Sequence, residues 1–398
     1  MSTDAAAKAT ITRHAHRAPT HHHVRRATRW LSRHLLDRFL LLPIGAVVAL
    51  IWANVGPESY FTMSQQLSFA VNEIGMAFFF VLLAQEIADA VMPGGALHSW
   101  RRWTLPLVAA VGGIAGAVTM YLGYVAWSYE YSLTPAWPIA CAVDAAATYY
   151  VLRTILPHNP AVPFALLVAI VSDVVGLVIV APRHLIMEAR VGGVATLMAA
   201  LAAAAIMRMM HVRRFWPYLC VAGSLSWLAF YWEGLHPAFS LIPIVPFLPH
   251  EPRRTNIFAD PRDDDAVHHG EHELHLLVQP VLLLFGLVNA GVVLTSYDTG
   301  SWAILSAELV GRPVGILLAV GLAIVAGLHL PGRMTWRELL VVAFATSTGF
   351  AIALFLATGV LATGPVLAQA KIGVLGSASG LVLALVAARL LKIGRLAH

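Results

Sequence analysis

A few ionisable side chains stand inside long apolar stretches of this sequence, and they are the groups whose types and spacing could do chemistry. Asp144 lies in a run of small residues, and Asp173 is the single carboxylate of an apolar segment. Glu308 and Arg312 share a third segment. An ionised side chain in such surroundings is costly unless it is paired or hydrated, so these residues must face protein or water. Because carboxylate oxygens take up protons and hard cations, the pattern indicates ion handling.

The composition excludes an ordinary soluble enzyme. Of the 398 residues, 59% are hydrophobic and only 12% are charged, whereas a soluble domain carries about a quarter charged residues. The sequence contains no P-loop, and no nucleophile stands with a plausible base. Two cysteines, Cys141 and Cys220, both lie in apolar stretches. We therefore expect an all-α polytopic membrane protein that is not an enzyme, with no cofactor, no metal centre and no nucleic-acid partner.

Helices that cross a bilayer must position the ionisable residues. From Leu35 onward, about twelve apolar segments of about 17 to 25 residues alternate with short polar breaks. We expect a transporter domain over 35–391, after a disordered basic tail (1–34) and before a short tail (392–398). Most of the 26 Lys and Arg residues fall in these tails and in alternate loops. That bias predicts a multi-pass protein of the cell inner (plasma) membrane with both termini in the cytoplasm.

Two of the segments are interrupted in the middle. Small residues surround Val143 and Asp144 in the first, and Thr346, Thr348 and Gly349 weaken the helix in the second. A pair of interrupted helices is the best sequence indication of a transporter's binding site at the middle of the bilayer. A packing face rich in small residues is the alternative interpretation.

Arg312 has two candidate partners. Asp173 in another helix could form a buried salt bridge with it. Glu308 lies four residues earlier, one helical turn away on the same face, and could neutralise the arginine alone. The sequence does not choose between them.

The loop 249–274 is acidic and rich in histidine. Histidine changes its charge between about pH 5 and 8, so this loop could sense cytoplasmic pH. A solvated acidic loop without that role is the alternative.

Short motifs are spread over nearly all of the apolar part of the chain. They are Val71-Asn-Glu-Ile-Gly-Met-Ala-Phe-Phe-Phe80, Gln85-Glu86, Val143-Asp144, Asp173 with Gly176, Gly234-Leu-His-Pro-Ala238, Val288-Asn-Ala-Gly291, Gly311-Arg-Pro-Val-Gly315, Thr348-Gly-Phe350 and Ala370-Lys-Ile-Gly-Val-Leu-Gly-Ser-Ala-Ser-Gly380. In order and spacing they resemble the motifs of the NhaA-type sodium/proton antiporters.

The resemblance implies an architecture and a set of roles. It implies inverted repeats, with spans three to five related to spans ten to twelve, and a crossing of the two discontinuous helices. It also implies proton exchange for Na+ or Li+ across the lipid bilayer and is compatible with a homodimer. By position, Asp144 balances half-helix ends, Asp173 binds the ion and the proton, and Arg312 supplies a counter-charge. The residues in positions that resemble the pH-sensing region are Glu86, His236, Glu271, His272, Glu273 and His275.

This sequence departs from the family pattern at the ion site itself. Aligned on Gly176, the second aspartate of the family's pair is Val174, which cannot bind a cation. A shift by one residue would instead place Ser172 and Asp173 at the pair. The family's threonine before the span-four aspartate is Val143, and Arg312 replaces a lysine.

These departures leave three functional hypotheses. The first is sodium/proton antiport with weakened cation coordination and fewer protons exchanged. The second is transport of another substrate on the same scaffold. The third is a structural or interaction protein that no longer transports, with Asp173 locked to Arg312.

Overall fold

The structure is a computed structural model that describes residues 41–91, 100–157, 159–180, 191–212, 214–248 and 269–396. Throughout these ranges the regular structure is helical, and no strand occurs in them. Six helices there are long and apolar enough to cross a membrane, and a bent pair makes a seventh. The predicted all-α membrane fold is confirmed.

The described helices group into the expected apolar segments. The first five are α2 (Leu41–Val55); α3 (Pro57–Phe69), η1 (Ala70–Gly75) and α4 (Met76–Val91); α5 (Trp100–Ser128); η2 (Tyr131–Cys141) and α6 (Ala145–Ile155); and α7 (Ala161–Val180). The next four are α8 (Val191–Met209); α9 (Phe215–Pro217), η4 (Tyr218–Gly223) and α10 (Ser224–Glu233); η5 (Pro237–Phe239) and η6 (Ile242–Phe247); and α11 (His269–Asn289). The last three are α12 (Thr299–Ser306), η8 (Ala307–Gly311) and α13 (Arg312–Val325); α14 (Trp336–Ala345) and α15 (Phe350–Val360); and α16 (Pro365–Ser377) with α17 (Ser379–Leu390).

Helix α2 illustrates how these sequences pack in lipid. Its buried positions include Gly45, Ala46 and Ala49, whereas the bulky Val47 and Ile51 are exposed. Small side chains let helix backbones approach each other, and large apolar side chains cover the surface that faces lipid. This distribution of small and large side chains is the reverse of that in a water-soluble protein, where the large apolar side chains of a helix are buried.

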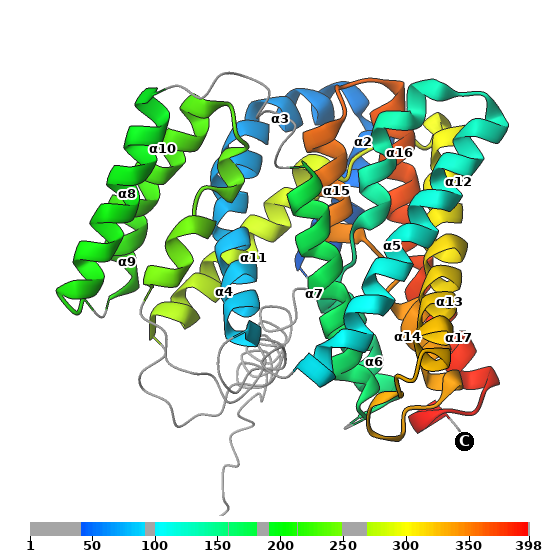
Figure 1. Ribbon diagram of the computed structural model, residues 1–398. Helices are drawn as coiled ribbons and strands as arrows, with labels where there is room; N and C mark the ends of the chain where they lie inside the picture. Colours follow the sequence, from blue (N-terminus) through cyan, green and yellow to red (C-terminus); the bar gives the residue numbers. More distant parts are fainter. Residues whose placement is uncertain are drawn as a thin grey trace, which may run out of the picture.

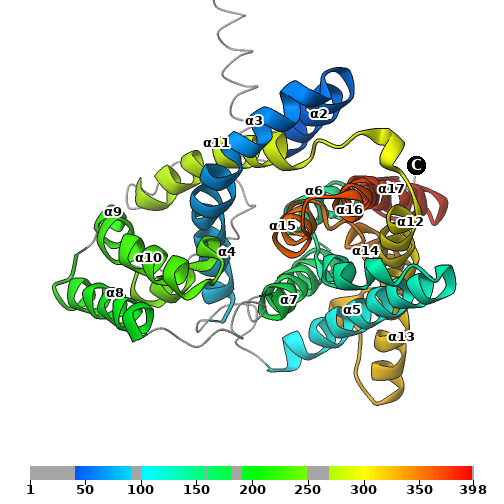
Figure 2. The ribbon, with the colours of Figure 1, turned by 90° about the horizontal axis from the view of Figure 1, so that it is seen from above.

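Two groups of helices lie side by side (Figures 1 and 2). One group contains α2 to α4 and α8 to α11. The other contains α5 to α7 and α12 to α17, that is, the third to fifth and tenth to twelfth segments. Each half of the second group runs in the same order: a long helix, an interrupted segment and another helix. This order agrees with the predicted repeat.

Close glycine contacts fix α13 against α5. A Cβ atom on Gly116 would lie 2.3 Å from the carbonyl oxygen of Gly311, and one on Gly315 would lie 2.1 Å from that of Gly112. Side chains larger than hydrogen cannot fit there, so the two backbones touch. Arg312 is placed between these contacts, and its position depends on them.

Polar contacts tie the first group together. The side-chain amides of Asn72 and Asn289 exchange hydrogen bonds of 3.1 and 2.7 Å. The Tyr60 hydroxyl accepts a 2.9 Å bond from the amide of Gly291, where a Cβ would collide with the tyrosine ring. The Asn and Gly of the motif Val288-Asn-Ala-Gly291 are therefore explained by packing.

Some predicted boundaries lie outside the described residues or differ from the structure. The tail 1–34 and the loop residues 249–268 lie outside. Helix α11 begins at His269, six residues before the expected start of that segment, so the last part of the predicted loop is helical. Of the short C-terminal tail, a final turn, η10 (Gly394–Leu396), is described.

Candidate functional site

The first interrupted segment contains an 11-residue 3-10 helix, a short extended stretch and an α-helix. η2 contains Pro135 and Pro138, which cannot donate backbone hydrogen bonds. The chain is extended at Ala142, and Asp144 then caps α6. Val143 and Asp144, predicted at a helix interruption, lie in this extended stretch.

The second interrupted segment bends by 43° between α14 and α15. Its break contains Thr346, Thr348 and Gly349. The Thr346 hydroxyl donates to the carbonyl of Val342 and the Ser347 hydroxyl to that of Ala343. The bond from Ser347 satisfies the carbonyl of Ala343, which loses its helical partner where α14 ends, whereas the carbonyl of Val342 also keeps its backbone bond from the amide of Thr346.

The two breaks cross each other. The amide of Asp144 donates a 2.6 Å hydrogen bond to the carbonyl of Thr348. The Thr148 hydroxyl donates a 2.9 Å bond to the carbonyl of Ala345, the last residue of α14. A Cβ on Gly349 would lie 2.8 Å from the carbonyl oxygen of Ala142. The predicted crossing of discontinuous helices is confirmed.

Asp144 serves two helix N-termini at once. Its carboxylate accepts a 3.0 Å bond from the amide of Ala147 in the first turn of α6. The backbone amides of Ala146 and of Ala351, at the start of α15, also interact favourably with its negative charge. Helix N-termini carry partial positive charge, so this carboxylate is balanced by the ends of both half-helices.

Arg312 lies at the opposite end of the first break. Its guanidinium donates to the carbonyl of Ala140 at 2.6 Å and to that of Ala142 at 2.8 Å, where η2 ends. The same group pairs with Glu308, with a distance of 2.9 Å between Nε and Oε2. Arg312 and Glu308 are 0% and 1% exposed. Of the two candidate partners, Glu308 therefore holds the arginine in an ion pair.

Asp173 lies next to the extended stretch. Its Oδ1 accepts a 3.1 Å hydrogen bond from the amide of Val143, and the residue is 1% exposed. Ser172 is 0% exposed, and its hydroxyl oxygen has no hydrogen-bond partner. Both follow Ala169 by three or four residues and share its face of α7. Because Ala169 packs on Val143 and Ala145, that face is directed at the first break.

Sequence reasoning missed two contributions to this site. Thr148 was not singled out, although a hydroxyl in a run of small residues was a usable signal. The amide of Val143 carries no signal, because every residue but proline has one. Although Val143 stands where the family has a threonine, the backbone amide at this position donates a hydrogen bond to Asp173.

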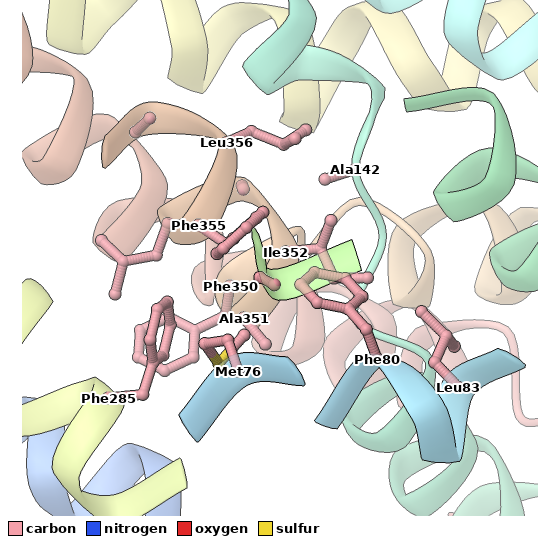
Figure 3. Close-up of a cluster of buried hydrophobic side chains, with 14 of the residues drawn as sticks. Met76, Phe80, Leu83, Ala142, Phe285, Phe350, Ala351, Ile352, Phe355 and Leu356 are labelled. Atoms are coloured by element: carbon pink, nitrogen blue, oxygen red, sulfur yellow. The ribbon is translucent and has the colours of Figure 1, made fainter. Parts of the chain in front are cut away.

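An apolar wall separates α4 from α15 (Figure 3). The rings of Phe80 and Phe355 have centroids 4.8 Å apart, and Phe239 lies 4.8 Å from Phe80. The ring of His236 lies 4.9 Å from Phe355, and its Nδ1 lies 3.3 Å from a carboxylate oxygen of Glu73. His236 therefore touches both helix groups.

The other candidates for pH sensing lie on described helices, but their side chains lie outside the description. Glu86 is part of α4, and the remaining four lie in the first turns of α11, namely Glu271, His272, Glu273 and His275. Helices α4 and α11 pack against each other.

Comparison with known proteins identifies the family. The family model described as Na+/H+ antiporter 1 matches residues 35–391. The chain belongs to this family. The Na+/H+ antiporter NhaA of Geobacter metallireducens is 36% identical over 88% of this chain and 95% of its own length. The NhaA of Desulfitobacterium hafniense is 38% identical over 88% and 94%.

A solved structure shares the fold at low sequence identity. The sodium proton antiporter MjNhaP1 of Methanocaldococcus jannaschii matches with a TM-score of 0.53 and 15% identity, covering 92% of this chain and 93% of its own. Within the Na+/H+ antiporter 1 family, the crossing of broken helices is thus combined here with a single aspartate on α7 and an arginine paired with Glu308.

The crossing predicts the effect of a change at Thr148. Thr148→Val keeps the shape but leaves the buried carbonyl of Ala345 without this donor, which should cost about 1–2 kcal/mol of stability. Thermal unfolding in detergent measures the loss. Thr154→Val on the same helix is the control, because its exposed hydroxyl bonds only within α6. Equal melting temperatures for the two variants would contradict the role of Thr148.

Proposed function

We propose that this chain exchanges protons for Na+ or Li+ across the plasma membrane, with Asp173 as the group that carries each in turn. The observation that supports this most is the buried carboxylate of Asp173 beside the unpartnered Ser172 oxygen, where two broken helices cross. A buried hydroxyl oxygen without a partner is costly, and a cation ligated there would satisfy it.

Ser172 and Asp173 supply oxygen ligands of the kind that a small hard cation needs. Carbonyl oxygens of the extended chain between η2 and α6 can complete the shell. The carboxylate of Asp144 interacts with the amides at the starts of α6 and α15, so it is not free to bind the cation directly. It would assist cation binding through its negative charge. One cycling carboxylate binds one proton or one monovalent cation, so we expect one proton to move for each cation.

Alternating access follows from the two helix groups. The broken segments belong to one group, and the apolar wall around Phe80 and Phe355 lies between that group and the other. Movement of α15 along this wall would open the ion site to one side and close it to the other. A cation or a proton on Asp173 removes the charge that otherwise opposes the crossing of an apolar layer.

We propose the orientation of the protein in the membrane from the distribution of its basic residues. The end of α6, the start of α14 and the C-terminal end of the chain lie at one end of the molecule (Figure 1). Arg153, Arg337 and Arg389 belong to these regions, and an excess of basic residues marks the cytoplasmic side. We therefore place both termini in the cytoplasm.

His236 is proposed as a pH-responsive contact. The neutral ring accepts a hydrogen bond from the amide of Ala238, whereas the protonated ring can donate to Glu73. A charged ring is also attracted more strongly to the neighbouring aromatic rings of Phe239 and Phe355. Protonation would thus hold α15 more firmly and slow exchange as the pH falls.

Replacing Asp173 tests the exchange itself. Asp173→Asn removes the proton and cation carrier and should abolish sodium-evoked proton flux, measured with a pH dye in proteoliposomes. Glu58→Gln, a change of the same kind at an exposed carboxylate, should leave the flux unchanged. Wild-type protein that gives no flux with sodium, lithium or potassium at any pH would refute the proposed function.

Replacing Ser172 tests the cation ligand. Ser172→Ala should raise the sodium concentration at half-maximal rate about tenfold, because one oxygen ligand is lost while the carboxylate remains. Proton binding should change little. Ser379→Ala at an exposed position is the control. An unchanged sodium dependence in folded Ser172→Ala protein would exclude this oxygen from the site.

Replacing His236 tests the pH response. His236→Gln keeps a hydrogen-bonding side chain but cannot become charged, so the variant should exchange faster than wild type at the acidic end of the pH range. Rates measured between pH 5.5 and 8.5 decide the matter. His329→Gln, at an exposed histidine, should keep the wild-type profile. Superimposable profiles for His236→Gln and wild type would remove His236 from the mechanism.

A further inference from the structure

The chain that follows α17 turns back and packs on the end of α6. At the end of α17, Lys392 takes a left-handed backbone conformation with a φ of 53°. The amide of Ile393 donates a 2.9 Å hydrogen bond to the carbonyl of Ala388, and the amide of Lys392 donates to that of Arg389. These are the bonds of a Schellman turn, which reverses the chain. A left-handed conformation is unfavourable for lysine and persists only where the surrounding structure holds it.

Two neighbouring residues make the contact with α6. Ile393 is 9% exposed and belongs to the apolar core that also contains Leu152, Ile155 and Leu156. Directly after it, Gly394 lies against the last residue of α6, because a Cβ atom on this glycine would lie 2.0 Å from the carbonyl oxygen of Ile155. Gly394 also has a positive φ of 63°. Both the backbone conformation and the closeness of α6 therefore require glycine here.

The other end of α6 forms part of the ion site. The amide of Val143, two residues before this helix, donates to Asp173, and the amide of Ala147 in its first turn donates to Asp144. Helix α6 has 11 residues and is therefore about 16 Å long. Because so short a helix moves as one rod, a shift at one end reaches the other. The two bonds are 3.1 and 3.0 Å long, and a binding site must be held to within about 0.5 Å.

The half-helix α14 is held at the same end of the molecule. Glu338, in its first turn, accepts a hydrogen bond from the side chain of Asn159, in the turn between α6 and α7. Glu338 also forms a capping box with Thr335. Helix α17 packs on both α6 and α14. The turn after α17 thus belongs to a set of contacts that holds both half-helices at the ends that lie away from the crossing.

We propose that Ile393 and Gly394 are positioning residues that hold this end of α6. Through the helix they keep the amide of Val143 on Asp173, in the geometry that binds the cation. The inference rests on the proposed exchange, and neither residue contacts the ion. A positioning role changes the sodium concentration at half-maximal rate. A mere loss of folded protein would lower the maximal rate and leave that concentration unchanged.

Gly394→Ala tests the contact with a matched control. The added Cβ either forces the turn off α6 or shifts the helix, so α6 loses its fixed position in both cases. The sodium concentration at half-maximal rate should rise several-fold while most of the maximal rate is kept. Gly327→Ala is the control, because Gly327 also has a positive φ, of 97°, but a Cβ there meets nothing within 4 Å. It introduces the same kind of backbone strain and should keep the wild-type sodium dependence.

Ile393 gives an independent test. Ile393→Ala removes most of the side chain from the core and should raise the same sodium concentration, whereas Ile393→Val keeps most of the packing and should stay close to wild type. Sodium-evoked flux is measured in proteoliposomes with an internal pH dye, over a range of sodium concentrations at one pH. Thermal unfolding in detergent establishes which variants are folded.

The outcomes separate this inference from the proposed function. No flux from wild-type protein would refute the exchange and, with it, the positioning role. Wild-type flux combined with an unchanged sodium dependence in folded Gly394→Ala and Ile393→Ala would overturn the inference and leave the exchange intact. An equal rise in Gly327→Ala would also overturn it, because backbone strain would then suffice. If Gly394→Ala does not fold, the comparison of Ile393→Ala with Ile393→Val decides.

Discussion

The need to satisfy backbone groups inside an apolar layer governs this structure. Two helices break inside the apolar layer, and each break leaves amides and carbonyls without their helical partners. The structure meets this need by crossing the breaks, so that Asp144 donates its amide to Thr348 and Thr148 donates its hydroxyl to Ala345. The crossing gathers these polar groups at one place, where the buried carboxylate of Asp173 also finds a backbone hydrogen bond.

The ends of the half-helices are served by different groups, and the difference has a physical meaning. The N-termini of α6 and α15 share one carboxylate, whereas the end of η2 has a guanidinium and the end of α14 has hydroxyls. The carboxylate of Asp144 is stabilised by backbone amides alone, whereas the guanidinium at the end of η2 lies beside a carboxylate. Glu308 is the carboxylate that pairs with Arg312, so the carbonyl end of η2 is in contact with a neutral ion pair.

Much of this site could be predicted from sequence because apolar surroundings make polar residues conspicuous. Asp144, Asp173 and the breaks were identifiable on that ground. The partner of Arg312 was left open, since spacing along one helix favours Glu308 while distance between helices cannot be read from a sequence. The carbonyls of Ala140 and Ala142, and the amide of Val143, could not be predicted, because backbone groups leave no trace in residue identity. Helix ends such as the start of α11 were uncertain for the same reason.

The departures from the family pattern become coherent when they are considered together. A valine at position 174 removes one carboxylate from α7, and an arginine at position 312 fixes one positive charge in the core. Relative to a site with two aspartates and a lysine, the loss of one aspartate removes one negative charge, whereas arginine in place of lysine keeps the positive charge. Glu308 restores the balance from within the same helix as the arginine, and Ser172 supplies an oxygen beside the remaining aspartate. In this arrangement Glu308 and Arg312 form an ion pair whose charges stay fixed. Asp173 is then the carboxylate that we propose exchanges its proton.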